Sequence, residues 1–331
     1  MKVLVTGASS MIGRAVVGQL IARGDDVVGF QRTSDPAAVP GAHEVLGDLA
    51  DQAAVEHVLA GRDAVIHLAA KVGVTGPWHD YHRINVDGTA RLVATARRVG
   101  VERFVHVSSP SVAHAGVPLV GAAAEPADPG STRGHYATTK AIAELATLAA
   151  SSDDLPIVAI RPHLVWGPGD TQLVGRIVDR GRRGRLALVG SGTALIDTTY
   201  VDNAADALIA ALDRAPTLAG RAFVVSNGEP RTVHELVQRI LAAAGVAWTP
   251  RRVPRWLAVG GGHVAERVWS LTGRTDDPPM TSFLAEQLST AHWFDQRVTR
   301  SALGWEPLVG LAEGFDRLAA SYRTGDDVVA T

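Results

Sequence analysis

A tyrosine and a lysine stand four residues apart in the stretch YATTK, which runs from Tyr136 to Lys140. In a helix this spacing places both side chains on one face, one turn apart. A nearby ammonium lowers the pKa of a phenol, about 10 in water, so we expect Tyr136 to exchange a proton near neutral pH. Nearly every other cation is an arginine, the remaining lysines being Lys2 and Lys71, which indicates a task for a compact ammonium.

Two serines, Ser108 and Ser109, end an apolar run in VHVSSPSV. A hydroxyl at the carboxyl end of a parallel strand faces the crevice where ligands bind in such sheets. It can hold a substrate oxygen beside the tyrosine. The alternative is that both serines satisfy the turn before Pro110.

A glycine turn, VTGASSMIGRA at residues 5–15, follows an apolar strand and precedes a helical pattern. Gly7 and Gly13 allow a tight turn and the approach of a pyrophosphate to the helix N-terminus. In the spacing TGxxGxxG, Ser10 replaces a glycine; in TGxxxGxG, Met11 does. A left-handed Ser10 would cost about 1 kcal/mol, whereas its hydroxyl could instead bond a pyrophosphate oxygen. An ordinary tight loop is the alternative to a dinucleotide site.

The end of the second strand carries Gln31 and Arg32 where NAD-binding units carry an acid for the ribose. A neutral residue followed by an arginine favours a 2′-phosphate, and hence NADP(H). NAD(H) is the alternative, with Arg32 solvated and Asp35 on the ribose.

Strand and helix patterns alternate through the first half of the chain. The expected strands are 2–6, 26–30, 43–47, 64–68, 103–108 and 156–161, and the expected helices 12–23, 51–60, 80–99 and 135–151. Nearly continuous apolar strands are typical of parallel sheets covered on both faces. The fold class is therefore α/β: a Rossmann-type, doubly wound parallel sheet with a smaller C-terminal α/β substrate lobe.

We assign residues 1–162 to the dinucleotide-binding domain and 163–325 mainly to the lobe, interleaved with late elements of the sheet, leaving 326–331 as a loose tail. The lobe has helical patterns at 171–184, 202–213, 232–244 and 281–288, and strand patterns near 186–189 and 222–226. One further stretch, 253–273, mixes Trp256 and Trp269 with arginines. It suits a membrane surface or a partner, or else a lobe helix over a substrate cleft, interrupted at 260–262.

The composition favours a small-molecule substrate. The 331 residues carry a net charge of -2 and no long basic run, which argues against nucleic acid as a partner. The chain has no cysteine, and its 12 histidines form no HExxH pattern, so no metal site is expected. We see no signal peptide and expect a cytoplasmic protein.

Seven motifs stand in the order typical of one superfamily: TGASSMIG, GDLAD (47–51), HLAA (67–70), NVDGT (85–89), VSSPSV, YATTK and RPHLVWGPGD (161–170). With them the chain resembles the extended branch of the short-chain dehydrogenase/reductase superfamily. Within that branch it is similar to the 3β-hydroxysteroid dehydrogenase group, and most of all to bacterial reductases of 2-alkyl-3-oxoalkanoates in long-chain olefin and β-lactone biosynthesis. KAIAE, DTTYVDNAA, SNGEP and FLAEQLSTAHWF carry this resemblance.

The resemblance implies Tyr136 as acid/base, Lys140 on the nicotinamide ribose, Ser109 with Ser108 on the substrate oxygen, and Asn85 on a supporting helix. The residues expected at the cofactor are Gly7, Ser9, Ser10, Met11, Ile12, Gly13, Gln31, Arg32, Asp48, Leu49, Leu68, Ala69, Ala70, Lys71, Tyr136, Lys140, Pro162 and His163.

A 2-alkyl-3-keto acid has a carboxylate and long chains. Arg161 or His163 could meet the carboxylate, with a structural ion pair as the alternative for Arg161 and a place in the pocket wall for His163. Apolar cover is expected from Trp166, Leu173, Trp256, Trp269 and Trp293.

The function that follows is NADPH-dependent reduction of a long-chain 2-alkyl-3-oxoalkanoate to the 2-alkyl-3-hydroxyalkanoate. Three alternatives are a 3β-hydroxysterol dehydrogenase, a nucleotide-sugar epimerase or dehydratase, and a non-catalytic NADP-sensing protein. The resemblance also implies a homodimer, and other enzymes of the same pathway are candidate partners.

Overall fold

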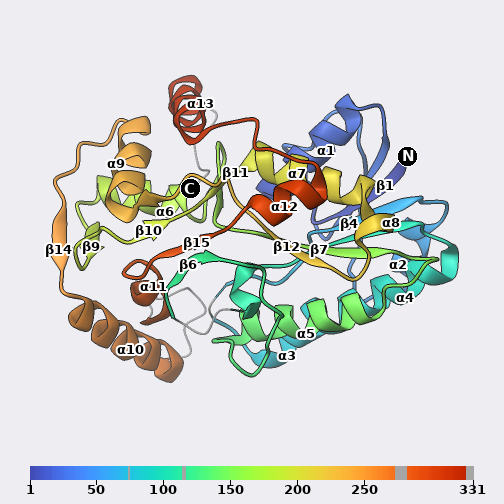
Figure 1. Cartoon of the computed structure of the whole chain (residues 1–331), viewed down its shortest axis with the longest axis horizontal. Coiled ribbons are helices and arrows are strands. Elements are labelled where there is room, and N and C mark those ends of the chain that lie inside the picture. The colour runs from blue at the N-terminus through green and yellow to red at the C-terminus, as the bar shows by residue number, and fades with distance from the viewer. Residues whose placement is uncertain (74, 114–116, 273–281, 326–331) are drawn as a thin grey trace.

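The computed structural model describes residues 1–73, 75–113, 117–272 and 282–325. The expected loose tail at 326–331 lies outside these described residues. Figure 1 shows the parallel sheet toward one end of the molecule and a smaller group of helices and short strands toward the other.

Seven parallel strands form the central sheet. Their order across it is β12 (Ala222–Val225), β7 (Ile157–Pro162), β5 (Arg103–Val107), β4 (Ala64–His67), β1 (Lys2–Thr6), β2 (Asp26–Gln31) and β3 (His43–Leu46). The strand order runs outward in both directions from β1 and β4, as in a doubly wound fold. The predicted fold class is confirmed. Register aligns Thr6 with His67 and His67 with His106, so the strands end at one common edge.

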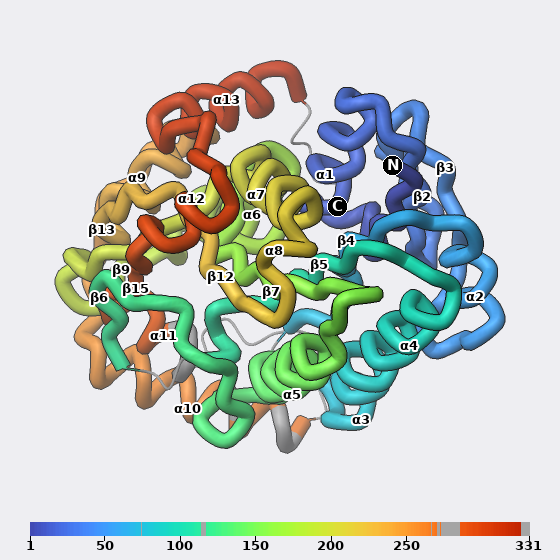
Figure 2. Tube along the Cα trace, turned by 45° about the vertical axis from the view of Figure 1, so that its right-hand side comes forward, coloured from blue at the N-terminus to red at the C-terminus, as the bar shows by residue number. Residues whose placement is uncertain are grey.

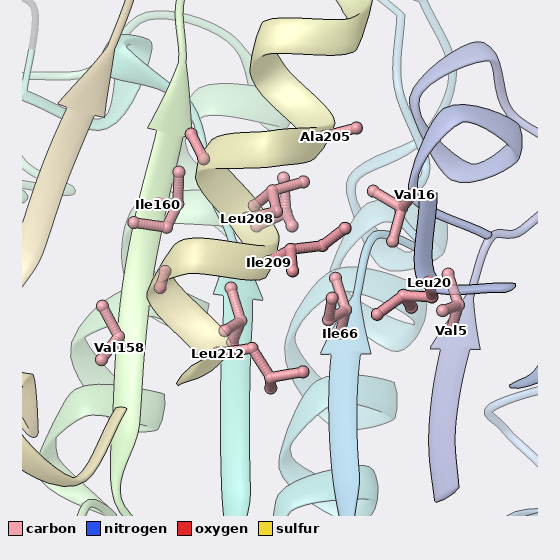
Figure 3. Close-up of a cluster of buried hydrophobic side chains, with 14 of the residues drawn as sticks. Val5, Val16, Leu20, Ile66, Val158, Ile160, Ala205, Leu208, Ile209 and Leu212 are labelled. Atoms are coloured by element: carbon pink, nitrogen blue, oxygen red, sulfur yellow. The ribbon is translucent and has the colours of Figure 1, made fainter. Parts of the chain in front are cut away.

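Helices cover both faces of this sheet. On one face α1 (Met11–Ala22) and α7 (Val201–Asp213) pack side by side, and Figure 3 shows Leu208, Ile209 and Leu212 of α7 over Ile66 and Val158. On the other face α2 (Gln52–Leu59), α4 (Thr89–Val99) and the strands share a second apolar cluster. Apart from the edge strand β3, which is mostly exposed, the strands are buried on both faces, which explains their continuous apolar sequence.

The predicted single helix over 80–99 is wrong in its details. The structure has a short helix α3 (Trp78–Tyr81), a π-helical turn η1 (His82–Gly88) and then α4. A π-turn inserts an extra residue per turn and is common at functional sites. Figure 2 shows α3, α4 and α5 (His135–Ala149) gathered on the same side of the sheet.

The lobe is built around a four-stranded sheet with the order β13 (Arg231–Thr232), β10 (Leu195–Ile196), β15 (His292–Phe294) and β6 (Leu119–Ala122). Its other elements are β9 (Ala187–Val189), β14 (Arg251–Val253), α6 (Val174–Arg182), α9 (Val233–Ala243), α10 (Arg255–Thr272), α11 (Ser282–Gln287) and α13 (Leu311–Thr324). Short connecting elements are η2 (Pro110–Ala113), β8 (Val165–Trp166), β11 (Thr199–Tyr200), α8 (Ala215–Leu218) and α12 (Arg297–Leu303).

Elements cross between the two parts of the chain. β6, from the first half, belongs to the lobe sheet. From the second half, β12 is a strand of the central sheet and α7 packs against that sheet. Within the stretch 253–273, the helix α10 begins at Arg255, is described as far as Thr272, and runs through Gly260 and Gly262 without the expected interruption. Among the described residues, no helix is both long and apolar enough to span a bilayer.

Candidate active site

Tyr136 and Lys140 lie in the first turns of α5. The helix begins after Gly134, whose φ of 83° reverses the chain without steric cost. Tyr136 is partly buried, whereas Lys140 is 2% exposed. The structure therefore puts the pair on one helix, as the spacing predicts.

The expected effect of Lys140 on Tyr136 is wrong for this structure. Burial raises the pKa of Tyr136, and a hydrogen bond with the Ser109 side chain opposes that rise, so the net shift is upward and not downward. The ammonium points into the protein instead. It donates to the Val107 carbonyl at 2.6 Å and lies 3.4 Å from His106 Nε2. Burial lowers the pKa of Lys140 to about 8, although the nearby Glu144 carboxylate counteracts this.

The serines after β5 differ in their surroundings. Ser109 bonds Tyr136 through its side chain, and its Oγ lies 2.9 Å from Ser111 Oγ and accepts from Ser111 N. It thus serves both the tyrosine and the turn. Ser108 donates its backbone N–H to Ile160, while its Oγ is buried without a hydrogen-bond partner. The Ser108 hydroxyl is thus a buried polar group whose hydrogen-bonding capacity the protein itself does not satisfy.

Asn85 supports the site from the π-helical turn. Its Oδ1 accepts from the N–H of Lys71 at 2.7 Å, and its Nδ2 donates to the Lys71 carbonyl and to Thr139 Oγ1 at 3.1 Å. It therefore ties the loop after β4 to the residue beside Lys140. This contact gives Asn85 a positioning role rather than contact with reacting atoms.

The glycine turn is too closely packed to accept side chains at its two glycines. Gly7 has a φ of 72°, and a Cβ on Gly13 would approach the Gly7 carbonyl oxygen to 2.3 Å. Ser10 is not left-handed: at φ -71° and ψ 159° it is the N-cap of α1. Its Oγ accepts from Gly13 N at 3.0 Å and donates to the Gly7 carbonyl at 2.8 Å. Neither strain nor a free hydroxyl therefore follows from the missing glycine.

The ribose end of the turn contains charges that pair with one another. Asp35 is 7% exposed and takes a two-pronged ion pair from Arg14, with distances of 2.7 and 2.9 Å, which lowers its pKa. The Gln31 amide donates to Glu44 at 2.6 Å. Arg32 is exposed and has no ion-pair partner among the described residues. Asp35 is thus already committed, which disfavours its alternative role on a ribose.

The other expected cofactor residues flank this turn. Ala69 N donates to Thr6 Oγ1 at 3.2 Å, and the Lys71 ammonium lies 3.5 Å from Asp80. Leu49 is buried, and Asp48 accepts from the N–H of Ala50. Ser9 lies in the turn, Met11 and Ile12 begin α1, Leu68 and Ala70 follow β4, and Pro162 ends β7.

These features fit a dinucleotide. The tight turn that contains Gly7 and Gly13, the N-terminus of α1 with no acidic residue in its first turn, and the unsatisfied Ser108 hydroxyl all lie at the ends of β1, β4 and β5. A helix N-terminus with close backbone access is suited to a pyrophosphate. Among the described residues, no group of three His, Asp or Glu side chains could hold a metal ion.

Arg161 does not contact substrate in this arrangement. Its guanidinium and Glu144 of α5 form a double ion pair, with Nε donating to Oε2 at 2.9 Å, and both side chains are 1% exposed. A third donor reaches the Glu125 carbonyl at 2.7 Å. The expected carboxylate contact is corrected to the structural alternative, because the charge is already neutralised and enclosed.

The lobe residues occupy different places. His163 Nε2 lies 3.1 Å from His292 Nδ1, so this ring belongs to a buried histidine pair. Trp166 donates to Thr198 at 2.9 Å, stacks on Phe315, and lines a small apolar cavity with Leu173. Trp256, by contrast, is 74% exposed on α10. Trp166 and Leu173 thus remain candidates for apolar cover, whereas Trp256 does not face an enclosed space.

Sequence reasoning missed Glu144, His106 and the Val107 carbonyl. Each acts through a contact between segments far apart in the chain, and a backbone carbonyl has no sequence signal. Glu144 does stand four residues after Lys140, on the same helix face. That spacing was the available signal.

A parallel dinucleotide fold with serine, tyrosine and lysine near its strand ends defines the extended short-chain dehydrogenase/reductase class. The chain belongs to the NAD dependent epimerase/dehydratase family, whose model matches residues 3–226. The family resemblance seen in the motifs is confirmed.

Two curated relatives and one solved structure show the range of similarity. The 2-alkyl-3-oxoalkanoate reductase of Stenotrophomonas maltophilia (strain K279a) is 44% identical over 97% of this chain and 99% of its own length. The human sterol-4-alpha-carboxylate 3-dehydrogenase, decarboxylating, is 29% identical over 96% of this chain and 87% of its own. The structure of MoeE5 in complex with UDP-glucose and NAD has a TM-score of 0.75 and 26% identity, and covers 98% of this chain and 99% of that one.

Proposed function

We propose that the protein is a ketoreductase that uses NADPH to reduce the 3-keto group of a hydrophobic 2-alkyl-3-oxo acid. The observation that supports this proposal is the hydrogen bond between Tyr136 and Ser109, which joins a phenol to the serine hydroxyl that follows β5. The names of the relatives at 44% and 39% identity support a 2-alkyl-3-oxoalkanoate as the substrate class.

The direction of the Tyr136 pKa suits reduction. Because burial raises it, the phenol is protonated at neutral pH and can act as an acid toward a developing alkoxide. Ser109 and Ser108 offer hydrogen bonds to the same oxygen, a contribution that grows as negative charge develops there. When bound, NADPH supplies the hydride. Lys140, held by Val107, would position the nicotinamide ribose.

Preference for NADP(H) rests on the end of β2. Gln31 carries no charge, and Arg32 is exposed and unpaired among the described residues. An arginine free of internal partners can bind a 2′-phosphate through two hydrogen bonds. Glu44 is held by Gln31, Ser34 and the backbone of Asp35, which limits its approach to that group.

One apolar cavity in the lobe supports an alkyl substrate over a nucleotide sugar. The cavity beside Trp166 is lined by apolar side chains, among them Ile177, Ile196 and Val237. Such a surface offers a diphosphate no charged partner. A rigid sterol is the remaining rival, supported by the human relative at 29% identity.

Turnover assays test the proposal directly. We expect NADPH oxidation with a 2-alkyl-3-oxo acid, and much slower turnover with a 3β-hydroxysterol plus NADP⁺ or with a nucleotide sugar. Tyr136→Phe should lower kcat by about 10²-fold or more, because the proton donor is lost, while NADPH binding measured by fluorescence stays within about twofold of the native protein. An active Phe variant would remove Tyr136 from the reaction. If the 3β-hydroxysterol is turned over faster than the 2-alkyl-3-oxo acid, the substrate class is a sterol and the proposal is wrong.

A further inference from the structure

A buried lysine faces two buried histidines behind the proposed site. His106 on β5 and His67 on β4 are both fully buried, and their ring centroids lie 5.7 Å apart. The Lys140 ammonium reaches this pair from α5, with Nζ 3.4 Å from His106 Nε2 and 2.6 Å from the Val107 carbonyl. Imidazoles enclosed beside an ammonium need an explanation, because this location disfavours a second positive charge.

The protonation state of His106 follows from these neighbours. Burial, and next the charge of Lys140, lower the pKa of His106 well below 6.5, so the ring is neutral. A neutral imidazole has one N–H and one acceptor nitrogen, and an ammonium only donates. The nitrogen facing Lys140 must therefore be the acceptor, which places the proton on Nδ1. That Nδ1 is buried without a partner, an arrangement that costs stability.

We propose that His106 is a positioning residue for Lys140. Its Nε2 and the Val107 carbonyl take two of the three ammonium donors and leave the third for the coenzyme. This inference rests on the proposed function, which assigns Lys140 to the nicotinamide ribose. The unsatisfied Nδ1 is then the cost of presenting an acceptor to the lysine.

The charged groups around Lys140 do not replace this acceptor. Glu144, one turn along α5, is engaged by Arg161 of β7. Tyr136 bonds Ser109. His67 uses both ring nitrogens, with Nδ1 2.7 Å from Thr6 Oγ1 and Nε2 2.9 Å from Thr89 Oγ1. His67 is therefore a matched control: an equally buried histidine of the same pair that does not contact the ammonium.

Two substitutions separate positioning from packing. His106→Phe keeps a ring in the core and removes the acceptor, whereas His106→Gln brings an amide oxygen to about the reach of Nε2. Without the acceptor, the Lys140 ammonium is less stabilised and loses its proton at lower pH. We expect the pH at which NADPH affinity begins to fall to move down by about one unit in the Phe variant, with about tenfold weaker binding at pH 8. The Gln variant should restore most of both.

NADPH fluorescence titrations from pH 6 to 9 provide the readout, with thermal unfolding to confirm folding. If His106 only packs the core, the Phe variant should retain more NADPH affinity than the Gln variant, because Phe packs into an apolar core better than Gln does. His67→Phe should leave the pH profile of NADPH binding in place. If His106→Phe does not fold, His106→Leu removes the acceptor with a smaller side chain.

Several results would overturn the inference: a native pH profile in the folded Phe or Leu variant, no rescue by Gln, or an equal shift in His67→Phe. The binding readout needs no keto substrate. A protein that shows the expected binding profiles but reduces none of the three substrate classes would therefore contradict the proposed reaction and leave the role of His106 standing.

Discussion

A few single residues set this site apart from the usual dinucleotide-binding pattern. They lie in the glycine turn and at the end of β2. Ser10, which breaks the glycine spacing, caps α1 and keeps extended backbone angles. Asp35 is held by Arg14, so that arginine is not available either. The one exposed, unpaired cation left among the described residues at this end is Arg32. Under the proposed function, the choice between NADPH and NADH would therefore rest on this side chain.

We predict that Arg32→Ala raises the KM for NADPH about tenfold or more, since a charge-assisted hydrogen bond contributes roughly 1.5–3 kcal/mol. The KM for NADH should change by less than about twofold, because NADH carries no 2′-phosphate. Steady-state kinetics with both coenzymes measure the ratio. Arg98→Ala, at an exposed pair with Glu56, is the control. Equal effects on the two coenzymes would contradict the assignment.

At the scale of elements, α5 must be held at a fixed depth against β5 and β7. The Glu144 and Arg161 pair joins the helix that carries Tyr136 and Lys140 to the strand beside the serines. Both groups are buried, so loss of either partner leaves an uncompensated charge. The pair thus couples site geometry to the stability of the fold.

Glu144→Gln should lower the free energy of unfolding by about 3–5 kcal/mol, the usual cost of breaking a buried pair. Glu56→Gln, which disrupts the exposed pair with Arg98, should cost no more than about 1 kcal/mol. Urea denaturation of both variants gives the comparison. Similar losses of unfolding free energy in the two variants would show that the buried pair stabilises the fold no more than the exposed pair does.

α10 presents an apolar stripe to solvent. Trp256, Leu257, Val264 and Val268 are exposed along it, and four arginines, Arg251, Arg252, Arg255 and Arg267, are exposed on or beside the helix. Figure 1 shows this helix at the periphery of the lobe, away from the central sheet. Amphipathic helices of this composition bind anionic membrane surfaces. Peripheral membrane contact through α10 is therefore a prediction that an experiment can test.

We expect co-sedimentation with vesicles that contain anionic phosphatidylglycerol, and less with neutral phosphatidylcholine. The double change Trp256→Ser, Leu257→Ser should remove most of it. Leu308→Ser, at a leucine 78% exposed outside this helix, should not. If the double variant instead abolishes a dimer seen by light scattering, the stripe is a contact between copies of the chain.

At the scale of the whole molecule, the two buried histidines couple folding to pH. Burial lowers the pKa of His67 to about 3, while an unfolded chain keeps the ordinary value near 6.5. Between these values the unfolded chain binds a proton that the folded protein does not. Stability contributed by neutral His67 is therefore present above pH 6.5 and is lost as pH falls toward 3.

His67→Leu should reduce the loss of unfolding free energy between pH 6.5 and 5 by about 1.4 kcal/mol per pH unit, the value of one linked proton. Urea denaturation at several pH values measures this slope. His57→Ala, at an exposed histidine of α2, should leave the slope unchanged. An unchanged slope in the His67 variant would mean that the histidine protonates in the folded state.

The sequence alone determined the parallel sheet, the glycine turn and the placement of Tyr136 and Lys140 on one helix. These follow from short-range patterns: continuous apolar runs, glycine spacing and helical periodicity. Tertiary structure decided that Lys140 faces His106, that Arg161 belongs to Glu144, and that Ser10 is a cap. The register of β4, β5 and β7 and the packing of α5 set the partners of Lys140 and Arg161, and such contacts between distant segments leave no local pattern to read. The contacts of Ser10 are to residues close to it in the chain. Its role was still not predictable, because a serine can adopt several backbone conformations and the folded turn selects one of them.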